Sequence, residues 1–182
     1  GTWQPSSQVA PGSPTDPRLV RLLQAAESLL DETQLSWLSA VAASDQAAWQ
    51  SLFGAIHDPS ALKSEINAFR YRPTKVTVRI ERDDPAAVLR EASAALVTGA
   101  TASFSFREEP TEGLAAALRG LGYCVSVTPD KQFDATAQGR VRHLGERDLL
   151  AEAGGSIDLN VYDGPSLPTG RLALLPYVHE QA

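Results

Sequence analysis

The sequence predicts an α/β fold with a doubly wound, mainly parallel sheet. Five short runs rich in β-branched and aromatic residues follow one another between residues 75 and 162, and helical patterns separate them. Parallel strands need such crossover connections, which are right-handed. With 182 residues, of which 43% are apolar, the chain is long enough for one full hydrophobic core and short for two comparable domains.

The first of these runs, at residues 75–81, organises the rest of the chain. Its β-branched residues alternate with polar ones, which is the two-residue period of a strand with one apolar face. Asp84 and Pro85 then supply an N-cap and a proline at the first helical position. The sequence therefore predicts a helix from Pro85 to about Thr98, with Gly99 ending it.

The remaining strands are expected at residues 102–106, 123–127, 141–144 and 157–162, with a last one at 171–175. Buried parallel strands usually read as continuous apolar runs, whereas these alternate. Either the small polar residues lie beneath closely packed helices, or one face of the sheet is thinly covered and meets another protein surface. Both readings stay open, and the residues concerned are Ser103, Ser105, Ser126, Asp158 and Asn160.

The first third of the chain is mostly helical. Asp16 and Pro17 begin an amphipathic helix to about Leu30, a second helical stretch follows, and Ser44 and Asp45 are expected to cap a third. We divide the chain into a linker at residues 1–14, a helical lead-in segment at 15–54 and the doubly wound domain at 55–182. Residues 60–69 fit either a short helix or an extended approach to the first strand.

Composition limits the classes of function. The net charge of −6 argues against a nucleic-acid surface, where clustered Lys and Arg replace counterions. No stretch approaches the roughly 20 apolar residues of a transmembrane helix. The single cysteine excludes a disulfide within the chain and favours a reducing compartment. We expect a cytoplasmic protein, and the absence of methionine together with the Pro-, Gly- and Ser-rich start favours a segment of a longer protein.

The turns after the strands do not have the glycines that let a phosphate approach a helix N-terminus. The turn at residues 81–85 and the turn at 107–112 are both acidic where a diphosphate would lie, and the turns at 128–130 and 144–146 hold at most one glycine. The sequence thus predicts no cofactor-binding residues in this chain.

No catalytic or metal-binding set is apparent either. Cys124 falls inside an expected strand, without a basic neighbour to activate it, and is predicted to be a buried structural cysteine. His143 is expected in a strand, and His57 and His179 in connecting or terminal segments, which is too scattered for a metal motif.

The densest basic run surrounds the first strand. The reading we prefer is ion pairing with the acidic turns of the chain itself. The more specific alternative is that the run is a docking surface for another domain, because Arg and Tyr are common among the residues that contribute most to binding. The run comprises Arg70, Arg72, Lys75, Arg79 and Arg82, with Phe69 and Tyr71 between them.

Two blocks of sequence carry a resemblance to a known family. The first runs from Asp58 to Pro73; the second comprises residues 161–165, Gly170–Arg171 and residues 174–182. Together they resemble the C-terminal region of actinobacterial proline utilization A, over roughly residues 55–182. Members of that family fuse a flavin-dependent proline dehydrogenase to an NAD-dependent glutamate-semialdehyde dehydrogenase, and longer members add a C-terminal domain of the aldehyde dehydrogenase superfamily.

The resemblance implies a Rossmann-like core with a small β-flap and without catalytic machinery. It implies FAD and NAD in the parent protein but not in this segment. It also implies docking against the aldehyde dehydrogenase domain of the same polypeptide, as a lid over the cavity through which the intermediate passes. The family continues past this end with a short terminal motif that closes the cavity. The candidate contact residues are Arg70, Tyr71, Arg72, Pro73, Tyr177 and His179.

Two other functions remain as alternatives at this point. One is a degenerate aldehyde dehydrogenase domain that still binds NAD and keeps residual activity. The other is a free-standing interaction module, with self-association as one form of partnership.

Overall fold

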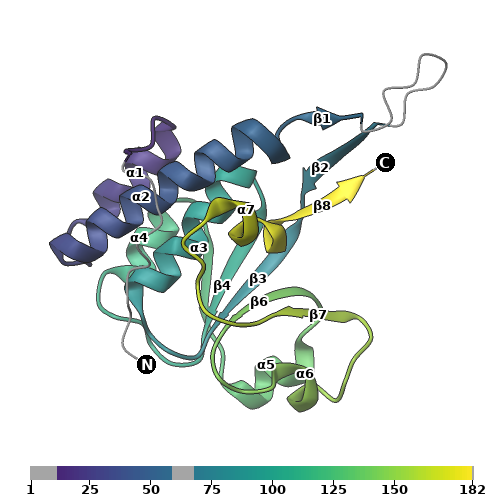
Figure 1. Ribbon diagram of the computed structural model, residues 1–182. Helices are drawn as coiled ribbons and strands as arrows, with labels where there is room; N and C mark the ends of the chain where they lie inside the picture. Colours follow the sequence, from purple (N-terminus) through teal and green to yellow (C-terminus); the bar gives the residue numbers. More distant parts are fainter. Residues whose placement is uncertain (1–11, 59–67, 182) are drawn as a thin grey trace.

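The computed structural model describes residues 12–58 and 68–181 and confirms the α/β, doubly wound fold. Its main sheet is parallel, with strand order β5-β4-β3-β6-β7 (Figure 1). The order runs outward from β3 in both directions, so the topological switch point lies between β3 and β6. The strands are β3 (Lys75–Ile80), β4 (Thr101–Phe106), β5 (Cys124–Val127), β6 (Gly139–Leu144) and β7 (Leu159–Tyr162).

The crossover helices are α3 (Pro85–Thr98), α4 (Leu114–Gly120), α5 (Asp130–Thr136) and α6 (Leu149–Glu152). Helix α3 begins and ends as predicted: the Asp84 carboxylate accepts a hydrogen bond from the Ala87 N–H, and Gly99 takes the left-handed conformation with φ of 73°. Most of α3 is buried, because further helices cover its outer side.

These covering helices are α1 (Pro17–Ala26) and α2 (Glu32–Ala48), followed by the π-helical turn η1 (Trp49–Phe53). Leu22 and Val41 belong to the same apolar core as Val78, so the helical lead-in, which packs on α3, shares the core of the doubly wound sheet. The prediction of a helix start at Ser44 and Asp45 was wrong. Asp45 is fully buried inside α2, where Arg90 neutralises it, and the helix therefore continues through this position.

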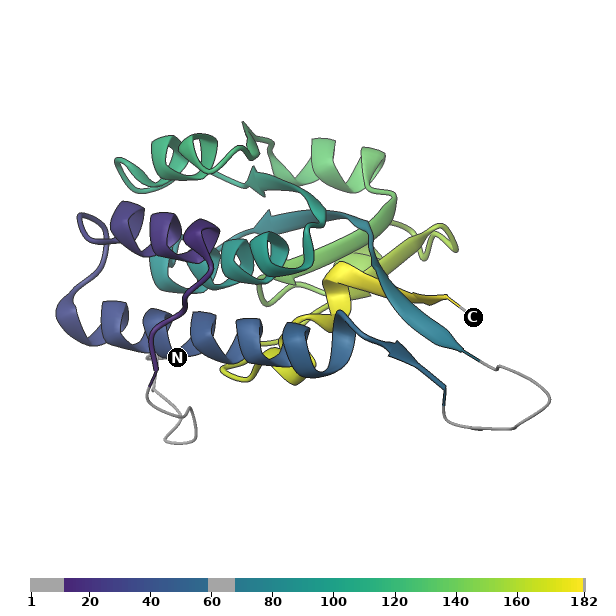
Figure 2. The same cartoon turned by 90° about the horizontal axis from the view of Figure 1, so that it is seen from above.

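A second, antiparallel sheet with order β1-β2-β8 projects from one end of the molecule (Figures 1 and 2). We call it the flap; it consists of β1 (Ile56–His57), β2 (Phe69–Pro73) and β8 (Val178–Gln181). Thr74 alone separates β2 from the central strand β3, so one run of chain serves both sheets. His57 and His179 both lie in strands of the flap, which corrects the connection expected for His57 and agrees with the terminal placement expected for His179. The open question about residues 60–69 concerns mostly residues outside the described part of the chain, although Phe69 begins β2.

The strand predicted at residues 171–175 was also wrong. This stretch forms the short helix α7 (Gly170–Ala173) and leads into the 3-10 turn η2 (Leu175–Tyr177). Gly170 explains the difference, because a Cβ there would lie 2.6 Å from the Asp45 Cα; only glycine lets α7 approach α2 so closely. Backbone contact with α2 therefore takes the place of pairing with a sheet.

The two faces of the parallel sheet are covered unequally. The main core packs against the face that carries Val76, Val78 and Ile80. The other face has a small cluster of Phe133, Val141, Leu149 and Leu159 beneath α5 and α6.

Beyond that cluster, the second face is polar and partly open. Lys75, Thr101, Cys124 and Ser126 are exposed, and Ser103 is half-buried. The alternating pattern left two interpretations open. For this half of the second face, the correct one is that helices cover it only thinly. Ser105 is the exception, because the Arg79 side chain covers it. Within the described ranges, no helix is both long and apolar enough to cross a membrane.

Candidate functional site

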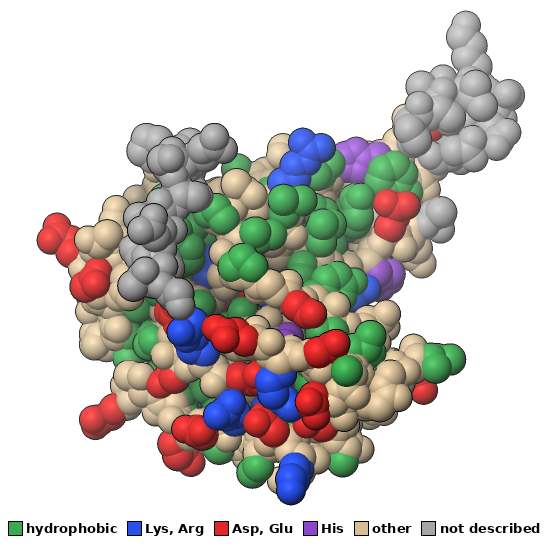
Figure 3. Space-filling view, turned by 60° about the horizontal axis from the view of Figure 1, so that its bottom comes forward, with side chains coloured by type: hydrophobic (Ala, Val, Ile, Leu, Met, Phe, Trp, Pro, Cys, Tyr) green, Lys and Arg blue, Asp and Glu red, His purple; other side chains and the backbone are tan. Residues whose placement is uncertain are grey.

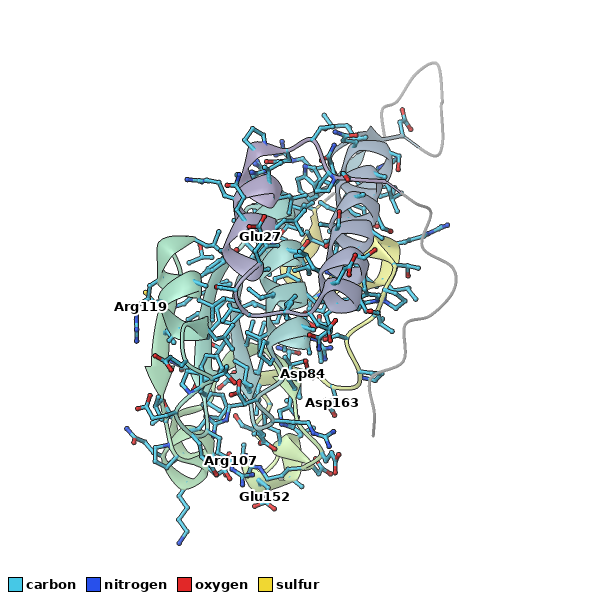
Figure 4. All side chains as sticks on the ribbon, turned by 90° about the vertical axis from the view of Figure 1, so that its left-hand side faces the viewer. Glu27, Asp84, Arg107, Arg119, Glu152 and Asp163 are labelled. Carbon is cyan, nitrogen blue, oxygen red and sulfur yellow. The ribbon has the colours of Figure 1, made fainter. Side chains whose placement is uncertain are left out.

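The carboxyl edge of the parallel sheet is where ligands bind in doubly wound folds, at the point where the strand order reverses. Here that edge is the end of the molecule that faces the viewer in the lower half of Figure 3, where acidic and basic side chains are intermingled. Figure 4 shows Arg107, which follows β4, and Glu152 of α6 at this same end.

Glu81 and Arg147 form the centre of this edge. Glu81 directly follows β3, and its side chain is only 5% exposed. Arg147 Nε donates to Glu81 Oε1 over 2.7 Å, while its two terminal nitrogens donate to the Asp134 carboxylate at 3.0 and 3.1 Å. Hydrogen bonding to Asp134, together with Glu81, raises the pKa of the Arg147 guanidinium despite its partial burial. An ion network thus links the residue after β3 with the turn after β6 and with α5.

A second arginine continues the network on the second face of the parallel sheet. Arg79 is fully buried, donates to Ser105 Oγ and to the Thr128 carbonyl, and pairs with Asp130 over 2.7 Å. Its guanidinium also lies over the Phe133 ring, 4.4 Å from the centroid. The preferred reading of the basic run therefore holds for Arg79, and Arg82 likewise lies 3.6 Å from Glu146.

His143, in β6, and Gly145, just after β6, border the network on that side. His143 Nε2 lies 3.0 Å from Glu81 Oε1, but the two groups are not aligned for a hydrogen bond. A Cβ at position 145 would overlap both the Glu81 carboxylate and the His143 ring. The one glycine in this turn therefore accommodates a neighbouring carboxylate.

The start of α3 is an unfavourable place for the diphosphate of a dinucleotide. A diphosphate above the N-terminus of α3 would approach the carboxylates of Glu81 and Asp84, and Asp84 already caps that helix. Phosphate binding needs free N–H groups and positive potential, whereas at the start of α3 the Ala87 N–H is capped by Asp84 and the Glu81 carboxylate is already paired with Arg147. The sequence predicted the acidic turns, but not Arg147, the arginine from the β6 side that pairs with Glu81 of the first turn.

The predicted contact residues come together in the flap. Arg70, Tyr71, Arg72 and Pro73 form most of β2 and face Gln181, Glu180, His179 and Val178 of β8 in register. Arg70 Nε and Arg72 Nε both donate to Gln181 Oε1, at 3.3 and 3.2 Å, so these two exposed arginines share a face of the flap.

Tyr71 lies on the opposite face of β2 from these arginines. Its ring packs edge-on against Phe53, with 4.9 Å between centroids. Burial, and then the facing Glu180, raise the pKa of the Tyr71 hydroxyl. Tyr71 thus fastens the flap to η1, and the more exposed candidates are Arg70, Arg72, Pro73 and His179.

Tyr177 differs from the other predicted contact residues. Its side chain is fully buried and its hydroxyl donates to Glu91 Oε2 over 2.8 Å. Burial, followed by the charge of Glu91, raises the pKa of this hydroxyl well above its ordinary value. As the chain is folded here, Tyr177 offers a partner no side-chain surface, so its prediction as a contact residue needs correction: it supports the flap from inside.

Cys124 also departs from its prediction. It is exposed, because β5 is an edge strand and the side chain lies on the thinly covered face of the sheet. Among residues 12–58 and 68–181, His, Cys, Asp and Glu form no group of three or more placed to hold a metal ion.

Sequence reasoning missed a cleft of about 250 Å³ beside α7. Leu167, Leu172 and Leu175 line it and are exposed, and Figure 3 shows hydrophobic side chains gathered above the charged end of the molecule. The buried pair Glu91 and Arg142 also lines this cleft, with 3.1 Å between Oε1 and the Arg142 nitrogen. No local signal predicts it, because its lining comes from α3, β6 and the segment after β7.

Fold and site together define a Rossmann-like α/β domain that has an ion network at the carboxyl edge of its parallel sheet and carries an antiparallel flap. A scan against protein-family models found no match, and neither did a search of curated proteins. The resemblance to proline utilization A therefore depends on the two sequence blocks.

Proposed function

We propose that this chain is a noncatalytic domain of a bifunctional enzyme that converts proline to glutamate. In this proposal it docks on the aldehyde dehydrogenase module of the same polypeptide and forms a lid over the cavity through which the intermediate passes. The lid contributes by excluding water and retaining the intermediate, and takes no part in the chemistry.

The observation that carries the proposal is the network at the carboxyl edge. Arg147 donates to both Glu81 and Asp134 at the switch point, where a working dehydrogenase domain needs an open phosphate site. A fold that keeps its sheet and helices but places an ion network at this edge retains its shape and loses the usual means of binding a dinucleotide.

Two surfaces support a docking role. The flap projects from the core and presents Arg70, Arg72 and His179 on its exposed strands. The second face of the parallel sheet leaves hydroxyl groups and Lys75 accessible instead of covering them with helices. Arginines and an open sheet face are features that suit contact with another domain.

The proposal is tested by comparing the intact parent enzyme with a version that lacks this domain. We expect the two half-reactions, each assayed with its own added substrate, to keep their rates. The coupled conversion of proline to glutamate should gain a longer lag, because the intermediate then escapes to solvent. Equal lags with and without the domain would rule out the lid.

A calorimetric titration of this chain with NAD addresses the alternative of a degenerate dehydrogenase. We expect no heat of binding at micromolar concentrations. Micromolar affinity would favour the degenerate dehydrogenase and contradict the proposal, since it requires a phosphate site that the network at Glu81 obstructs.

A further inference from the structure

The segment that joins β7 to β8, residues 163–177, crosses the outside of the core and leads to the flap; we call it the strap. Buried polar side chains hold it. Arg142 donates to the carbonyls of Tyr162 and Gly164, at 2.9 and 3.0 Å, and Arg90 Nε donates to the Leu167 carbonyl over 2.7 Å. The strap is therefore attached along its first half by arginines of β6 and α3.

Glu91 is the common point of these contacts. Its carboxylate accepts hydrogen bonds from Ser166 Oγ and Tyr177 OH, each over 2.8 Å, and pairs with Arg142 over 3.1 Å. The residue is 2% exposed. Burial alone would raise its pKa, but the charges of Arg142 and Arg90 outweigh burial and hold the pKa of Glu91 below its ordinary value. One ionised carboxylate thus binds the strap both near its start, at Ser166, and at its end, at Tyr177.

Tyr177 connects the Glu91 carboxylate to the flap. It is the last residue of η2 and directly precedes β8. Its carbonyl accepts the Thr74 N–H over 3.1 Å, and Thr74 is the residue between β2 and β3. The next residue, Val178, faces Pro73 as the innermost pair of the ladder between β2 and β8. Tyr177 therefore lies where the flap joins the core.

We propose that Glu91 is the positioning residue of the flap: through the Tyr177 hydroxyl it fixes the base of the ladder between β2 and β8 against α3. The inference depends on these contacts alone and not on the proposed function. A buried hydrogen bond to an ionised acceptor is among the stronger ones, and its loss leaves part of the carboxylate unsatisfied. Without it, the flap opens more often while the parallel core stays closed.

Hydrogen–deuterium exchange of the whole 182-residue chain tests this, with Tyr177→Phe as the variant. The substitution removes one oxygen and preserves the ring. Tyr123→Phe is the matched control, because Tyr123 OH donates to the Ala92 carbonyl on the same helix, over 3.1 Å, and Tyr123 directly precedes β5, a strand of the parallel sheet and not of the flap. Exchange is read in peptides that cover β2, β8 and, as an internal reference, β4.

In Tyr177→Phe we expect the amides of β2 and β8 to exchange roughly tenfold faster or more, as the loss of one hydrogen bond to a charged group implies. Those of β4 should keep their wild-type rates. Tyr123→Phe should leave the flap unchanged. Wild-type exchange of the flap in Tyr177→Phe would overturn the proposal, and so would an equal increase in β4, since that would show a general loss of stability.

Glu91→Gln provides a second variant, which retains the size of the side chain and one acceptor but removes the charge. We expect it to accelerate exchange in both the strap and the flap, because Arg142 and Tyr177 lose the same ionised partner. An acceleration confined to the strap would show that Tyr177 does not transmit the attachment, and would also contradict the proposal.

Discussion

Gly145 is the residue at which close packing leaves the least room. It follows β6, next to the point where the Glu81 carboxylate and the buried His143 ring meet. Both neighbours are held in place, Glu81 by Arg147 and His143 by its position inside the sheet. Neither can move aside without breaking other contacts.

Gly145→Ala is therefore expected to lower the free energy of unfolding by about 1–3 kcal/mol, the usual range for overpacking a tight site. Urea denaturation followed by circular dichroism measures it. Gly120→Ala is the matched control: Gly120 ends helix α4 with nothing within 4 Å of its added Cβ. That change should be neutral or slightly stabilising, because alanine favours helix. Equal effects of the two substitutions would show that the space around Gly145 is not limiting.

At the scale of elements, the contact between α2 and α3 depends on a buried ion pair. Arg90 of α3 donates two hydrogen bonds to the Asp45 carboxylate of α2, at 2.7 and 2.8 Å, and both side chains are fully buried. Ser93 Oγ donates a third bond to the same carboxylate. Asp45 therefore keeps its partners inside the helix pair without contact with water.

Arg90→Met should lower the free energy of unfolding by about 3–5 kcal/mol, because it leaves the Asp45 charge buried without its partner. The comparison is Arg18→Met, which breaks an ion pair of similar length, 2.6 Å to Asp16, whose side chains are 44% and 20% exposed. That loss should be at most about 1 kcal/mol. Denaturation of both variants under the same conditions measures the contrast, and similar losses would contradict the importance given to burial.

The sequence predicted those elements whose signals are local. Asp16 and Asp84 each precede a proline and cap a helix as expected, and the strand runs gave the parallel sheet. The sequence around Asp45 resembles that of a helix N-cap, but Asp45 instead pairs with Arg90, 45 positions away. Residues 171–175 likewise read as a strand because their contact with α2 is not encoded in their own periodicity.

The same limit applied to the candidate site. The acidic turn after β3 was visible in the sequence, whereas its pairing with Arg147 required three crossovers, through α3, α4 and α5, to bring that side chain to Glu81. The burial of Tyr177 required knowledge of Glu91 as its partner. Long-range pairs between charged groups were thus the part that local patterns could not supply.

At the scale of the whole molecule, the free energy of unfolding should depend on pH through the ionisation of Glu91. Its pKa is lowered in the folded chain from an ordinary value of 4.5. Above that value the carboxylate is ionised in both states and its full contribution is present. As the pH falls below about 4.5, the unfolded chain takes up the proton first, so this contribution is progressively lost.

Urea denaturation between pH 7 and pH 3 should therefore show wild type losing stability toward acid more steeply than Glu91→Gln. The difference between the two should be largest near neutral pH and shrink below pH 4.5. Glu27→Gln, at an exposed position just after α1, controls for the removal of one carboxylate and should follow wild type. Parallel curves for wild type and Glu91→Gln would contradict the assignment.

The ladder that closes the flap joins residues far apart in the chain: Arg70 faces Gln181, 111 positions later. The parallel sheet brings together nearer segments, and such contacts form faster. During synthesis β2 therefore leaves the ribosome long before β8 exists, and one of its edges stays unpaired while the rest of the domain assembles. A nascent chain that stalls before residue 178 presents that edge to its neighbours, which makes incomplete chains the species most prone to aggregate.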